Sequence, residues 1–404
     1  MPLIVQKYGG TSVADAERIL NVARRIVAAR EKGNDVVVVV SAMGDTTDDL
    51  LELAHQVAER PSEREVDVLL STGEIVSSTL LAMALKSLGY EAKSLTGAQA
   101  GILTDANHNR ARILSIDPAR IHKEIKQGYI VIVAGFQGIT DEMDVTTLGR
   151  GGSDTTAVAL AAKLGASVCE RYTDVSGIYT ADPRVVPDAV KLAEISYEEM
   201  LELSTYGSKV VHPRAVELGE IYHIPILVAS SFNDHPGTLI HGGLMEIRNK
   251  VTAITHDMNV AKITVLGVPD RPGIAAALFS PLAAAGVSVD TIVQNASIDR
   301  ITDLTFTVAR DDADKVLTIV KPIAESIGAR ECSVDTTLGK ISIIGSGMLN
   351  APGYAARMFS TLSDQGINIQ LISTSEIRIT VIISADKVKE AVKALHKAFD
   401  LDKP

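Results

Sequence analysis

The sequence predicts an α/β protein: a three-layer αβα domain with a mainly parallel, open sheet, followed by two ferredoxin-like domains. Two observations lead to this prediction. In the first 240 or so residues, short apolar runs alternate with helical stretches, as expected for a parallel sheet with helices on both faces. In the last 140 or so, one βαββαβ pattern occurs twice.

The first half contains six clear elements. We expect strands at 3–8, 35–42, 129–139 and 224–230, and helices at 15–30 and 155–166. Ser12 and Asp15 are spaced as in a capping box that starts the first helix, and Gly165 closes the second. This alternation is typical of βαβ units and therefore favours a parallel sheet.

The second half is an internal repeat. The stretch 261–292 matches 339–372, with Pro272-Gly273 aligned to Pro352-Gly353. Each copy continues through a further strand and a helix, and the first copy also through a last strand. Because 237–260 is turn-rich and has no strong period, we place a boundary there. The predicted domains are 1–243, a linker at 244–260, then 261–336 and 337–404.

Composition limits the possible partners. The chain has 404 residues, 46% of them hydrophobic, and a net charge of −11, which argues against nucleic acid or an anionic membrane as the main partner. Cys169 and Cys332 lie far apart, which predicts two inert thiols in a reducing cytoplasm. We find no signal peptide and no apolar run long enough to span a bilayer, so the expected location is cytoplasmic.

Two glycine-rich loops carry basic residues. In "KYGGTSV", Lys7 ends a strand, and Gly9 and Gly10 let backbone N–H groups approach an anion. In "TTLGRGGSDTTA", Arg150 suits a carboxylate, while Ser153 and Asp154 stand at the start of a helix. Taken singly, each loop could be a tight turn with a surface cation, and Asp154 could be a plain helix cap.

Four further segments place polar residues near strand or helix ends. They are "SAMGDTTDDL", "LLSTGE" with Glu74, "YTDVSGIYTADPR", and "YGSKVVHPRA" with Lys209. The sequence has no GxxxxGK[ST] motif, and its nearest approach to GxGxxG fails at the last position, so neither a P-loop nor a dinucleotide fingerprint is present. No close histidine spacing indicates a metal site, and we assign no metal ligand from the protein.

Together and in this order, these motifs resemble aspartate kinase, a member of the amino-acid kinase family, and the repeat is similar to its tandem regulatory ACT domains. The resemblance implies that Lys7, Asp154 and Lys209 are catalytic. It implies an ATP site formed by Lys7, Gly9, Gly10, Thr173, Asp174, Tyr179, Arg184 and Lys209. It implies an aspartate site formed by Ser41, Thr47, Glu74, Arg150 and Ser153, with Glu74 on the substrate ammonium.

The resemblance also implies the reaction and its control. With ATP and Mg²⁺, L-aspartate would become 4-phospho-L-aspartate, the first step toward lysine, threonine and methionine, with lysine or threonine as effectors. The effector positions implied are Asp270, Gly273, Ile274, Gln294 and Asn295 in the first repeat, and Asn350, Gly353, Asn368 and Ile369 in the second. Paired ACT domains imply a homo-oligomer, or a heterotetramer with a regulatory subunit started internally at Met245.

The residues of the sequence leave two other functions open. One is a different amino-acid kinase, such as glutamate 5-kinase or N-acetylglutamate kinase. The Glu74 and Arg150 pair and the tandem ACT domains argue against both, and an N-acetylated substrate would offer Glu74 no ammonium. The other is an amino-acid sensor without catalysis, against which the intact Lys7, Asp154 and Lys209 speak.

Overall fold

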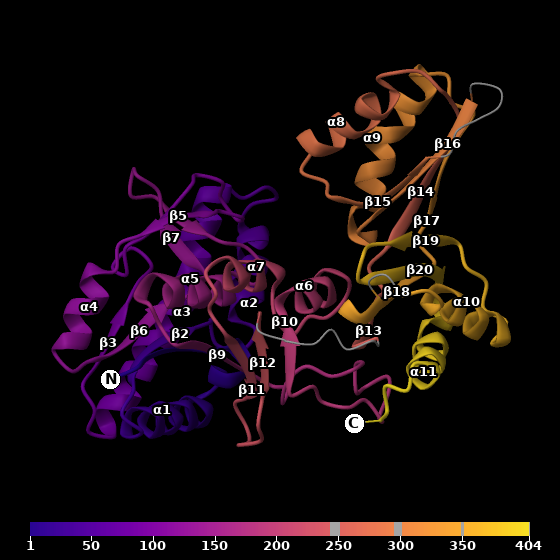
Figure 1. Ribbon diagram of the computed structural model, residues 1–404. Helices are drawn as coiled ribbons and strands as arrows, with labels where there is room; N and C mark the ends of the chain where they lie inside the picture. The colour runs from indigo at the N-terminus through magenta and orange to yellow at the C-terminus, as the bar shows by residue number, and fades with distance from the viewer. Residues whose placement is uncertain (243–250, 295–300, 349–350, 404) are drawn as a thin grey trace. The chain divides into compact units, whose positions relative to one another are not determined.

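A computed structural model describes residues 1–242, 251–294, 301–348 and 351–403, which form two compact units. The first unit contains residues 1–179, 191–205 and 209–242. The second contains 180–190, 206–208 and the described residues from 251 onward. Each unit has its own sheets and its own core (Figure 1).

The first unit is built on an eight-stranded sheet in the order β10-β12-β11-β9-β1-β2-β6-β3, mostly parallel. All its pairings are parallel except β11 with β12. The strands are β1 (Leu3–Tyr8), β2 (Asp35–Val40), β3 (Ala92–Leu95), β6 (Ile130–Ala134), β9 (Val168–Thr173), β10 (Glu194–Ser196), β11 (Ile226–Ser230) and β12 (Thr238–His241). The predicted parallel sheet is confirmed.

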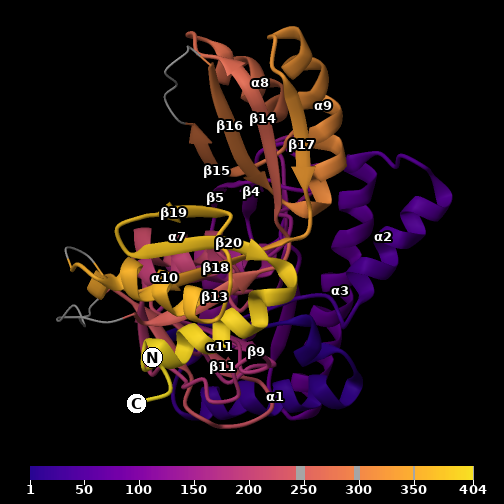
Figure 2. The same ribbon diagram turned by 90° about the vertical axis from the view of Figure 1, so that its right-hand side faces the viewer.

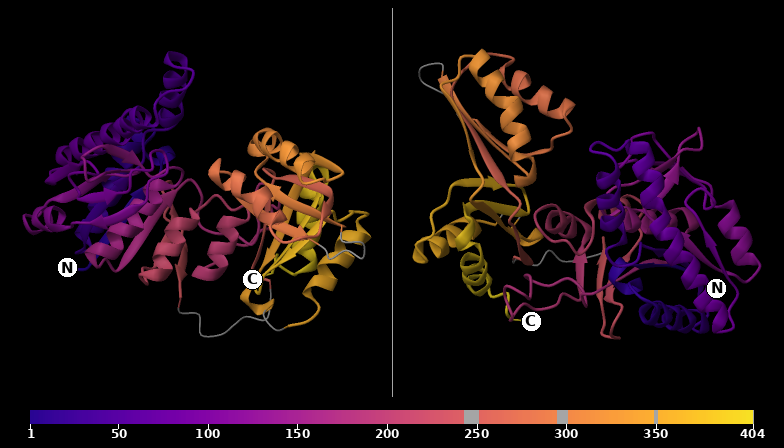
Figure 3. Two further views of the ribbon diagram at one scale, coloured as in Figure 1. Left: turned by 90° about the horizontal axis from the view of Figure 1, so that it is seen from above. Right: turned by 180° about the vertical axis from the view of Figure 1, so that it is seen from behind.

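Helices cover both faces of this sheet (Figure 3). They are α1 (Ala16–Glu31), α2 (Thr46–Val57), α3 (Glu63–Ser87), α4 (Ala119–Lys126), α5 (Gly152–Leu164), α6 (Tyr197–Thr205) and α7 (Pro213–Ile221). α1 and α3 pack on the face that carries Ile4 and Tyr8. α5 and α7 lie on the opposite face, which carries Lys7. Since side chains alternate along a strand, Lys7 points away from the α1 side.

The predicted helix caps differ from the observed ones. Asp15 itself caps α1, because its carboxylate accepts the N–H of Arg18 at 2.9 Å. Ser12 lies in a preceding 3₁₀ turn, where its hydroxyl donates to Ser231 at 2.9 Å. The prediction of a Ser12–Asp15 capping box is therefore wrong: the true cap stands one turn later.

α3 is the longest helix, with 25 residues. Its length and a mean hydropathy of 1.6 would suit a membrane span, although the sequence has no unbroken apolar run of that length. It is 56% buried over that window and carries the buried carboxylates Asp67 and Glu74. We therefore interpret α3 as a core helix.

A smaller sheet, β5-β4-β7-β8, also belongs to the first unit. Its strands are β4 (Ile102–Thr104), β5 (Ile113–Ile116), β7 (Gln137–Ile139) and β8 (Val145–Thr147). The single strand predicted at 129–139 is thus two strands, β6 and β7, in different sheets. The break falls at Gly135 and Phe136, where a Cβ on Gly135 would meet Ser153 Cβ at 2.9 Å and Phe136 has a positive φ of 69°.

The second unit contains two four-stranded antiparallel sheets, β15-β16-β14-β17 and β13-β18-β20-β19 (Figure 2). The first comprises β14 (Ala261–Pro269), α8 (Ile274–Ala284), β15 (Val289–Gln294), β16 (Ile301–Val308), α9 (Ala313–Ser326) and β17 (Glu331–Asp335). The second comprises β18 (Leu338–Ile344), α10 (Tyr354–Asp364), β19 (Leu371–Thr374), β20 (Arg378–Ser384) and α11 (Val388–Ala398), with β13 (Ala253–Asp257) at its edge. Both predicted ferredoxin-like folds are confirmed.

The origin of β13 differs from expectation. Residues 253–257, placed in the linker by sequence, pair antiparallel with β18 over Ala253↔Ile344 to Asp257↔Lys340. The edge strand of the second repeat thus comes from a segment that precedes the first repeat in the sequence. β13 stands beside β18 in the position that β17 takes beside β14 in the first repeat.

The second unit also incorporates two pieces of the first half of the chain. Ala181, Val185 and Val186 belong to the core formed by β18, β20, α10 and α11. Thr180 contacts His396 Nε2 through its hydroxyl at 2.9 Å. The segments 180–190 and 206–208 therefore fold with the second repeat.

Candidate active site

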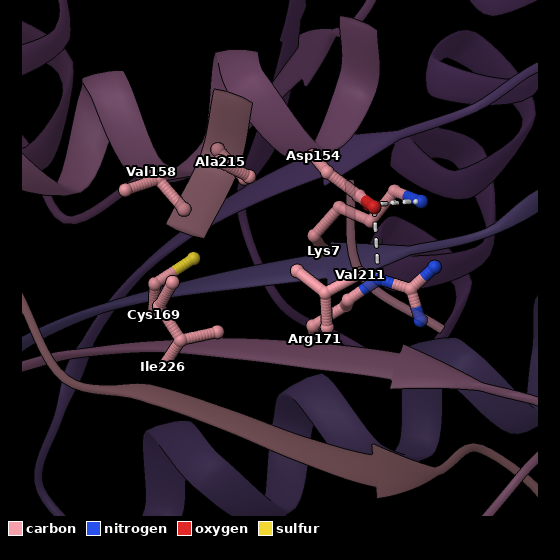
Figure 4. Close-up of a pocket in the computed structure, with 9 residues that line it drawn as sticks. Lys7, Asp154, Val158, Cys169, Arg171, Val211, Ala215 and Ile226 are labelled. Carbon is pink, nitrogen blue, oxygen red and sulfur yellow. Dashed lines mark hydrogen bonds and ion pairs between the residues drawn. The ribbon is translucent and has the colours of Figure 1, made fainter. Parts of the chain in front are cut away.

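Three charged side chains meet at the carboxyl ends of β1 and β9 (Figure 4). Lys7 and Arg171 are register partners on these neighbouring parallel strands. Asp154, in the first turn of α5, stands between them: Lys7 Nζ lies 2.7 Å from Oδ1 and Arg171 Nε 3.0 Å from Oδ2. The Lys7 and Asp154 side chains are each 7% exposed and Arg171 is 12% exposed, so the cluster is largely withdrawn from water.

Burial and mutual charge set the protonation of this cluster. Burial alone would raise the pKa of Asp154, but Arg171 and Lys7 outweigh it and hold that pKa well below its usual value. Burial lowers the pKa of Lys7, Asp154 opposes this, and Arg171 lowers it further. An anion bound beside Lys7 would raise the lysine pKa again. The cluster has two cations for one carboxylate, which suits an anionic ligand.

Beneath the cluster is a cavity with room for about one water molecule, lined mostly by apolar side chains. Cys169 lies there, and burial raises the pKa of its thiol. Both cysteines are free, as predicted.

Glu74 sits where α3 passes the end of β2. Its Oε1 accepts the N–H of Ala42 at 3.1 Å, and its side chain is buried. Burial raises the pKa of Glu74 to about 8, while the Ala42 N–H and the charge of Lys7 act in the opposite direction. Ser77, one turn along α3, donates to the carbonyl of Ser41 at 2.7 Å and ties the helix to the strand end.

The loop after β1 makes close backbone contacts. A Cβ on Gly10 would meet the carbonyl oxygens of Ala42 and Gly44 at 2.9 and 3.0 Å, so only glycine fits. The N–H of Gly9 donates to the carbonyl of Tyr172 at 3.3 Å. It is therefore already bonded and would have to share or exchange that bond to meet a phosphate.

The loop with Arg150 is held from three sides. A Cβ on Gly151 would meet His212 Cγ at 2.2 Å, so the loop lies directly on His212. Arg214 donates from Nη1 to the carbonyl of Leu148 at 2.8 Å. The buried Asp67 accepts from Thr147 Oγ1 at 2.5 Å.

These contacts determine which side chains in and after the loop are exposed and which are buried. Arg150 is exposed, whereas Ser153 is buried in α5, whose N-cap is Gly151 rather than Ser153 or Asp154. Thr47 stands half-buried in the first turn of α2.

The residues expected to bind ATP are divided between the two units. Thr173 ends β9 and its hydroxyl donates to Asp174 at 3.0 Å. Tyr179 bridges to Lys191, and Lys209 is exposed; both belong to the first unit. Arg184 belongs to the second unit, where it pairs with Asp182 at 2.8 Å.

Three buried side-chain atoms of this site have no hydrogen-bond partner among the described residues: Asp154 Oδ1, Glu74 Oε2 and Arg171 Nη1. Asp154 Oδ1 is compensated by its ion pair with Lys7 at 2.7 Å, which leaves Glu74 Oε2 and Arg171 Nη1. A buried unsatisfied polar group usually indicates a missing partner. The carboxylate oxygen needs a donor, such as an ammonium, and the guanidinium nitrogen needs an acceptor, such as a phosphate oxygen. The site is thus suited to an amino acid next to a phosphate.

Sequence reasoning missed several residues of this site, above all Arg171, Asp67 and Arg214. Arg171 and Thr173 are two residues apart in the strand β9, so their side chains lie on the same face of the sheet. Since Thr173 was already a predicted ATP-site residue, this spacing could have identified Arg171. Asp67 and Arg214 act on backbone groups far away in sequence, which no local pattern shows.

The described effector positions of the second unit lie either at the start of a helix or at the end or beginning of a strand. Gly273 and Gly353 are the N-caps of α8 and α10, with φ of 94° and 106°. Ile274 begins α8, the exposed Asp270 follows β14, and Gln294 ends β15. Asn368 and Ile369 precede β19. Asn295, Asn350 and Met245 lie outside the described residues.

Family models match three successive parts of the chain. The model of the amino acid kinase family matches residues 2–230, more than half of the sequence. Two models of the ACT domain match residues 262–325 and 341–399.

Whole-chain comparisons give closely similar proteins. The chain is 52% identical to an aspartokinase of Mycolicibacterium smegmatis over 407 residues, 99% of this chain and 97% of that one. It is 51% identical to an aspartokinase of Corynebacterium glutamicum, with the same coverage.

Among solved structures, it is similar to E. coli aspartokinase III in complex with aspartate and ADP, with 26% identity, a TM-score of 0.83, and 98% and 100% of the two chains covered. The same enzyme in complex with lysine and aspartate gives a TM-score of 0.76 at 26% identity, covering 98% of this chain and 99% of that one.

Proposed function

This chain belongs to the aspartokinases of the amino acid kinase family and has their activity, aspartate kinase; from that premise we propose that the Lys7–Asp154–Arg171 cluster binds the phosphates of ATP beside an aspartate held by Glu74. The product is 4-phospho-L-aspartate. The proposal rests chiefly on one observation: a buried carboxylate oxygen at the end of β2 and a buried guanidinium nitrogen on β9 lack partners, on the two sides of β1.

The order of the strands supports this division of the site. β9, β1 and β2 are neighbours in the sheet, so Lys7 on β1 lies between Arg171 on β9 and the Ser41–Glu74 side at β2. ATP would occupy the β9 side, where the chain continues into Thr173 and Asp174. Aspartate would occupy the β2 side, and the transferring phosphoryl group would lie at Lys7.

The chemistry requires positioning and charge neutralisation rather than a base. The substrate carboxylate is already a nucleophile: one of its oxygens attacks the γ-phosphorus of ATP, and ADP leaves with the bonding electrons. Two unit negative charges at ~4 Å repel by roughly 4 kcal/mol at an effective dielectric near 20. Lys7 reduces this repulsion, while Arg150 orients a substrate carboxylate and Lys209 supplies a further phosphate contact.

We propose that Mg²⁺ enters the site with ATP. No cluster of three or more His, Cys, Asp or Glu side chains able to hold a metal occurs among the described residues. In nucleotide sites, phosphates and waters supply most of the ligands of Mg²⁺. The ion would neutralise charge on the phosphates, and we assign no protein ligand to it.

The direct test is an assay of ADP release with L-aspartate, L-glutamate and N-acetylglutamate as acceptors. We expect turnover with aspartate and none with N-acetylglutamate, whose acetylated nitrogen offers Glu74 no ammonium. L-Glutamate also has a free ammonium, so its rate relative to aspartate is the informative comparison. Turnover that prefers glutamate would favour a glutamate 5-kinase-like enzyme, and no turnover with any acceptor would favour a sensor without catalysis.

Glu74 predicts a pH dependence of aspartate binding. With a pKa of about 8 before aspartate binds, Glu74 is mostly protonated at pH 7, whereas only the carboxylate pairs with an ammonium. Affinity for aspartate should therefore rise about tenfold per pH unit well below pH 8 and level off near it. The measurement is the KM for aspartate from pH 6 to 8.5 at saturating ATP.

The control for this prediction is Glu74→Gln, which keeps the shape and the acceptor for Ala42 but cannot ionise. It should weaken aspartate binding and flatten the pH profile, while the KM for ATP changes little. If the variant kept the slope of the wild type, another group would be titrating.

We further propose that lysine, threonine or both inhibit the enzyme by binding at the α8 and α10 N-termini, which suit an amino-acid carboxylate. The E. coli relative solved with lysine supports this choice of ligand. The segments 180–190 and 206–208 fold with the second repeat, and the chain leads directly from them to Tyr179 and Lys209. A change in the second unit would therefore reach two ATP-site residues through the backbone.

Tyr206 is the side chain best placed to carry such a change. Arg378 of β20 lies over its ring at 3.8 Å and Lys340 of β18 at 4.8 Å. Lys340 also forms an ion pair with Asp290 of β15 at 2.8 Å. Through this pair, the first repeat is linked to the side chains that contact the Tyr206 ring. Tyr206→Leu should therefore raise the lysine concentration for half-inhibition by about fivefold or more.

The control is Tyr206→Phe, which keeps the ring and should keep inhibition near the wild-type level. The measurement is an inhibition curve with lysine and threonine, singly and combined. Unchanged inhibition of Tyr206→Leu would remove the ring from the coupling.

We also propose a cytoplasmic homo-oligomer, or a heterotetramer with an internally started regulatory subunit. β15 and β19 each form one edge of their sheet and expose Ile292 and Ile372, at 52% and 44%. These two isoleucines are equivalent in the repeat, and open apolar edges favour pairing with another sheet. Sedimentation of the full chain tests the assembly.

A further inference from the structure

Arg171 has a second role beyond holding Asp154. Its Nε already donates to Asp154 Oδ2 at 3.0 Å, while its Nη1 is buried without a partner among the described residues. A guanidinium nitrogen in that position costs free energy unless something accepts from it. If the only role of Arg171 were to hold Asp154, a shorter side chain with a donor nitrogen at the position of Nε would be enough.

The direction of the side chain indicates what the partner is. In Figure 4 the Arg171 guanidinium and the Lys7 amine point to the same side of Asp154, away from the apolar part of the cavity with Cys169 and Val158. Two cations presented side by side and shared by one carboxylate leave a net positive charge. An anion with several oxygens can accept from both.

The sheet places this anion on the nucleotide side. Arg171 is in β9, the strand that leads into Thr173 and Asp174, whereas Glu74 lies at β2 beyond Lys7. We propose that Arg171 is a further catalytic residue, whose Nη1 donates to an oxygen of the terminal phosphates of ATP during the reaction. This proposal rests on the function proposed above and adds a second fixed cation to it.

The role follows from the chemistry of the guanidinium. Arginine stays charged when buried and its donors are arranged as a fork, so one residue can hold a carboxylate with Nε and a phosphate with Nη1. Negative charge moves toward the leaving ADP as the phosphoryl group is transferred. A cation already fixed by Asp154 stabilises that charge without having to reorganise.

Arg171→Gln separates the two roles. The side-chain nitrogen of glutamine stands at the same number of bonds from Cα as Nε of arginine, so it can still donate to Asp154, but the charge and Nη1 are gone. Arg171→Lys keeps the charge without the fork. Arg24→Gln, on the exposed surface of α1, is the matched control.

The experiment is titration calorimetry with AMP, ADP and the non-hydrolysable ATP analogue AMP-PNP, with turnover measured separately. We expect Arg171→Gln to weaken ADP and the analogue about 10–100-fold, with AMP and the KM for aspartate little changed. kcat should fall by a similar factor, Arg171→Lys should recover part of the loss, and Arg24→Gln should match the wild type.

Two results would overturn the proposal. One is an Arg171→Gln variant that binds ADP like the wild type, because the donor to Asp154 would then be all that matters. The other is a loss confined to aspartate, which would make Arg171 a ligand of the substrate carboxylate. Since binding is measured without turnover, neither result depends on whether wild-type enzyme phosphorylates aspartate, which the acceptor assay decides.

Discussion

Lys7→Met is expected to lower kcat by about 10³-fold with MgATP and aspartate, because the variant removes the cation that lies where the two anionic reactants meet. The fold should survive: Asp154 keeps its ion pair with Arg171 at 3.0 Å, so no buried charge is left alone. Binding of aspartate should change less than turnover, because the Glu74 carboxylate can still pair with the ammonium of aspartate.

The measurement is steady-state ADP release, accompanied by thermal unfolding to show that the variant is folded. Lys86→Met, in the exposed last turn of α3, is the control for loss of a lysine in itself and should keep full activity. A Lys7→Met enzyme with more than about a tenth of the wild-type kcat would exclude Lys7 from the transfer step.

Asp154→Ala should have the largest effect on stability. It would leave Lys7 and Arg171 buried side by side without a counter-charge, and loss of one partner from a buried ion pair typically costs about 3–5 kcal/mol. Turnover should also be lost, because Asp154 orients both cations. Thermal and urea unfolding of the variant, read on the transition of the first unit, measure the effect.

A compensating change tests this explanation. Adding Lys7→Met to Asp154→Ala removes one of the two unpaired cations, so the double variant should be more stable than Asp154→Ala alone. If the second substitution destabilised the protein further, repulsion between the cations would not be the cause.

The pH dependence of this contribution has a definite sign. The pKa of Asp154 is held below its ordinary value of 3.8, so the folded state favours the carboxylate. The stability gained is complete at neutral pH and decreases as the pH falls below about 3.8. Asp154→Ala should therefore differ most from the wild type near neutrality and approach it in acid.

Local features of the sequence predicted much of the catalytic half. The strand at 3–8 and the helix at 15–30 follow from apolar periodicity, and both are present as β1 and α1. The resemblance implied catalytic roles for both Lys7 and Asp154, and these two side chains lie 2.7 Å apart. The helix N-caps were harder to predict. Asp15 and Gly151 are the observed caps, but Ser12, Ser153 and Asp154 nearby are residue types that suit a cap equally well.

What the sequence by itself determined is the identity and order of the elements: the alternating strands and helices, the glycine loops after strands, and the two ferredoxin-like repeats. These depend on periodicity and turn chemistry, which are read from neighbouring residues. Only the tertiary structure decided that Arg171 stands beside Lys7, that 253–257 completes the second repeat, and that 180–190 and 206–208 fold with it. Each of these depends on which distant strands pair and in which register, and that choice follows from burial and hydrogen bonding across the whole domain rather than from any local pattern.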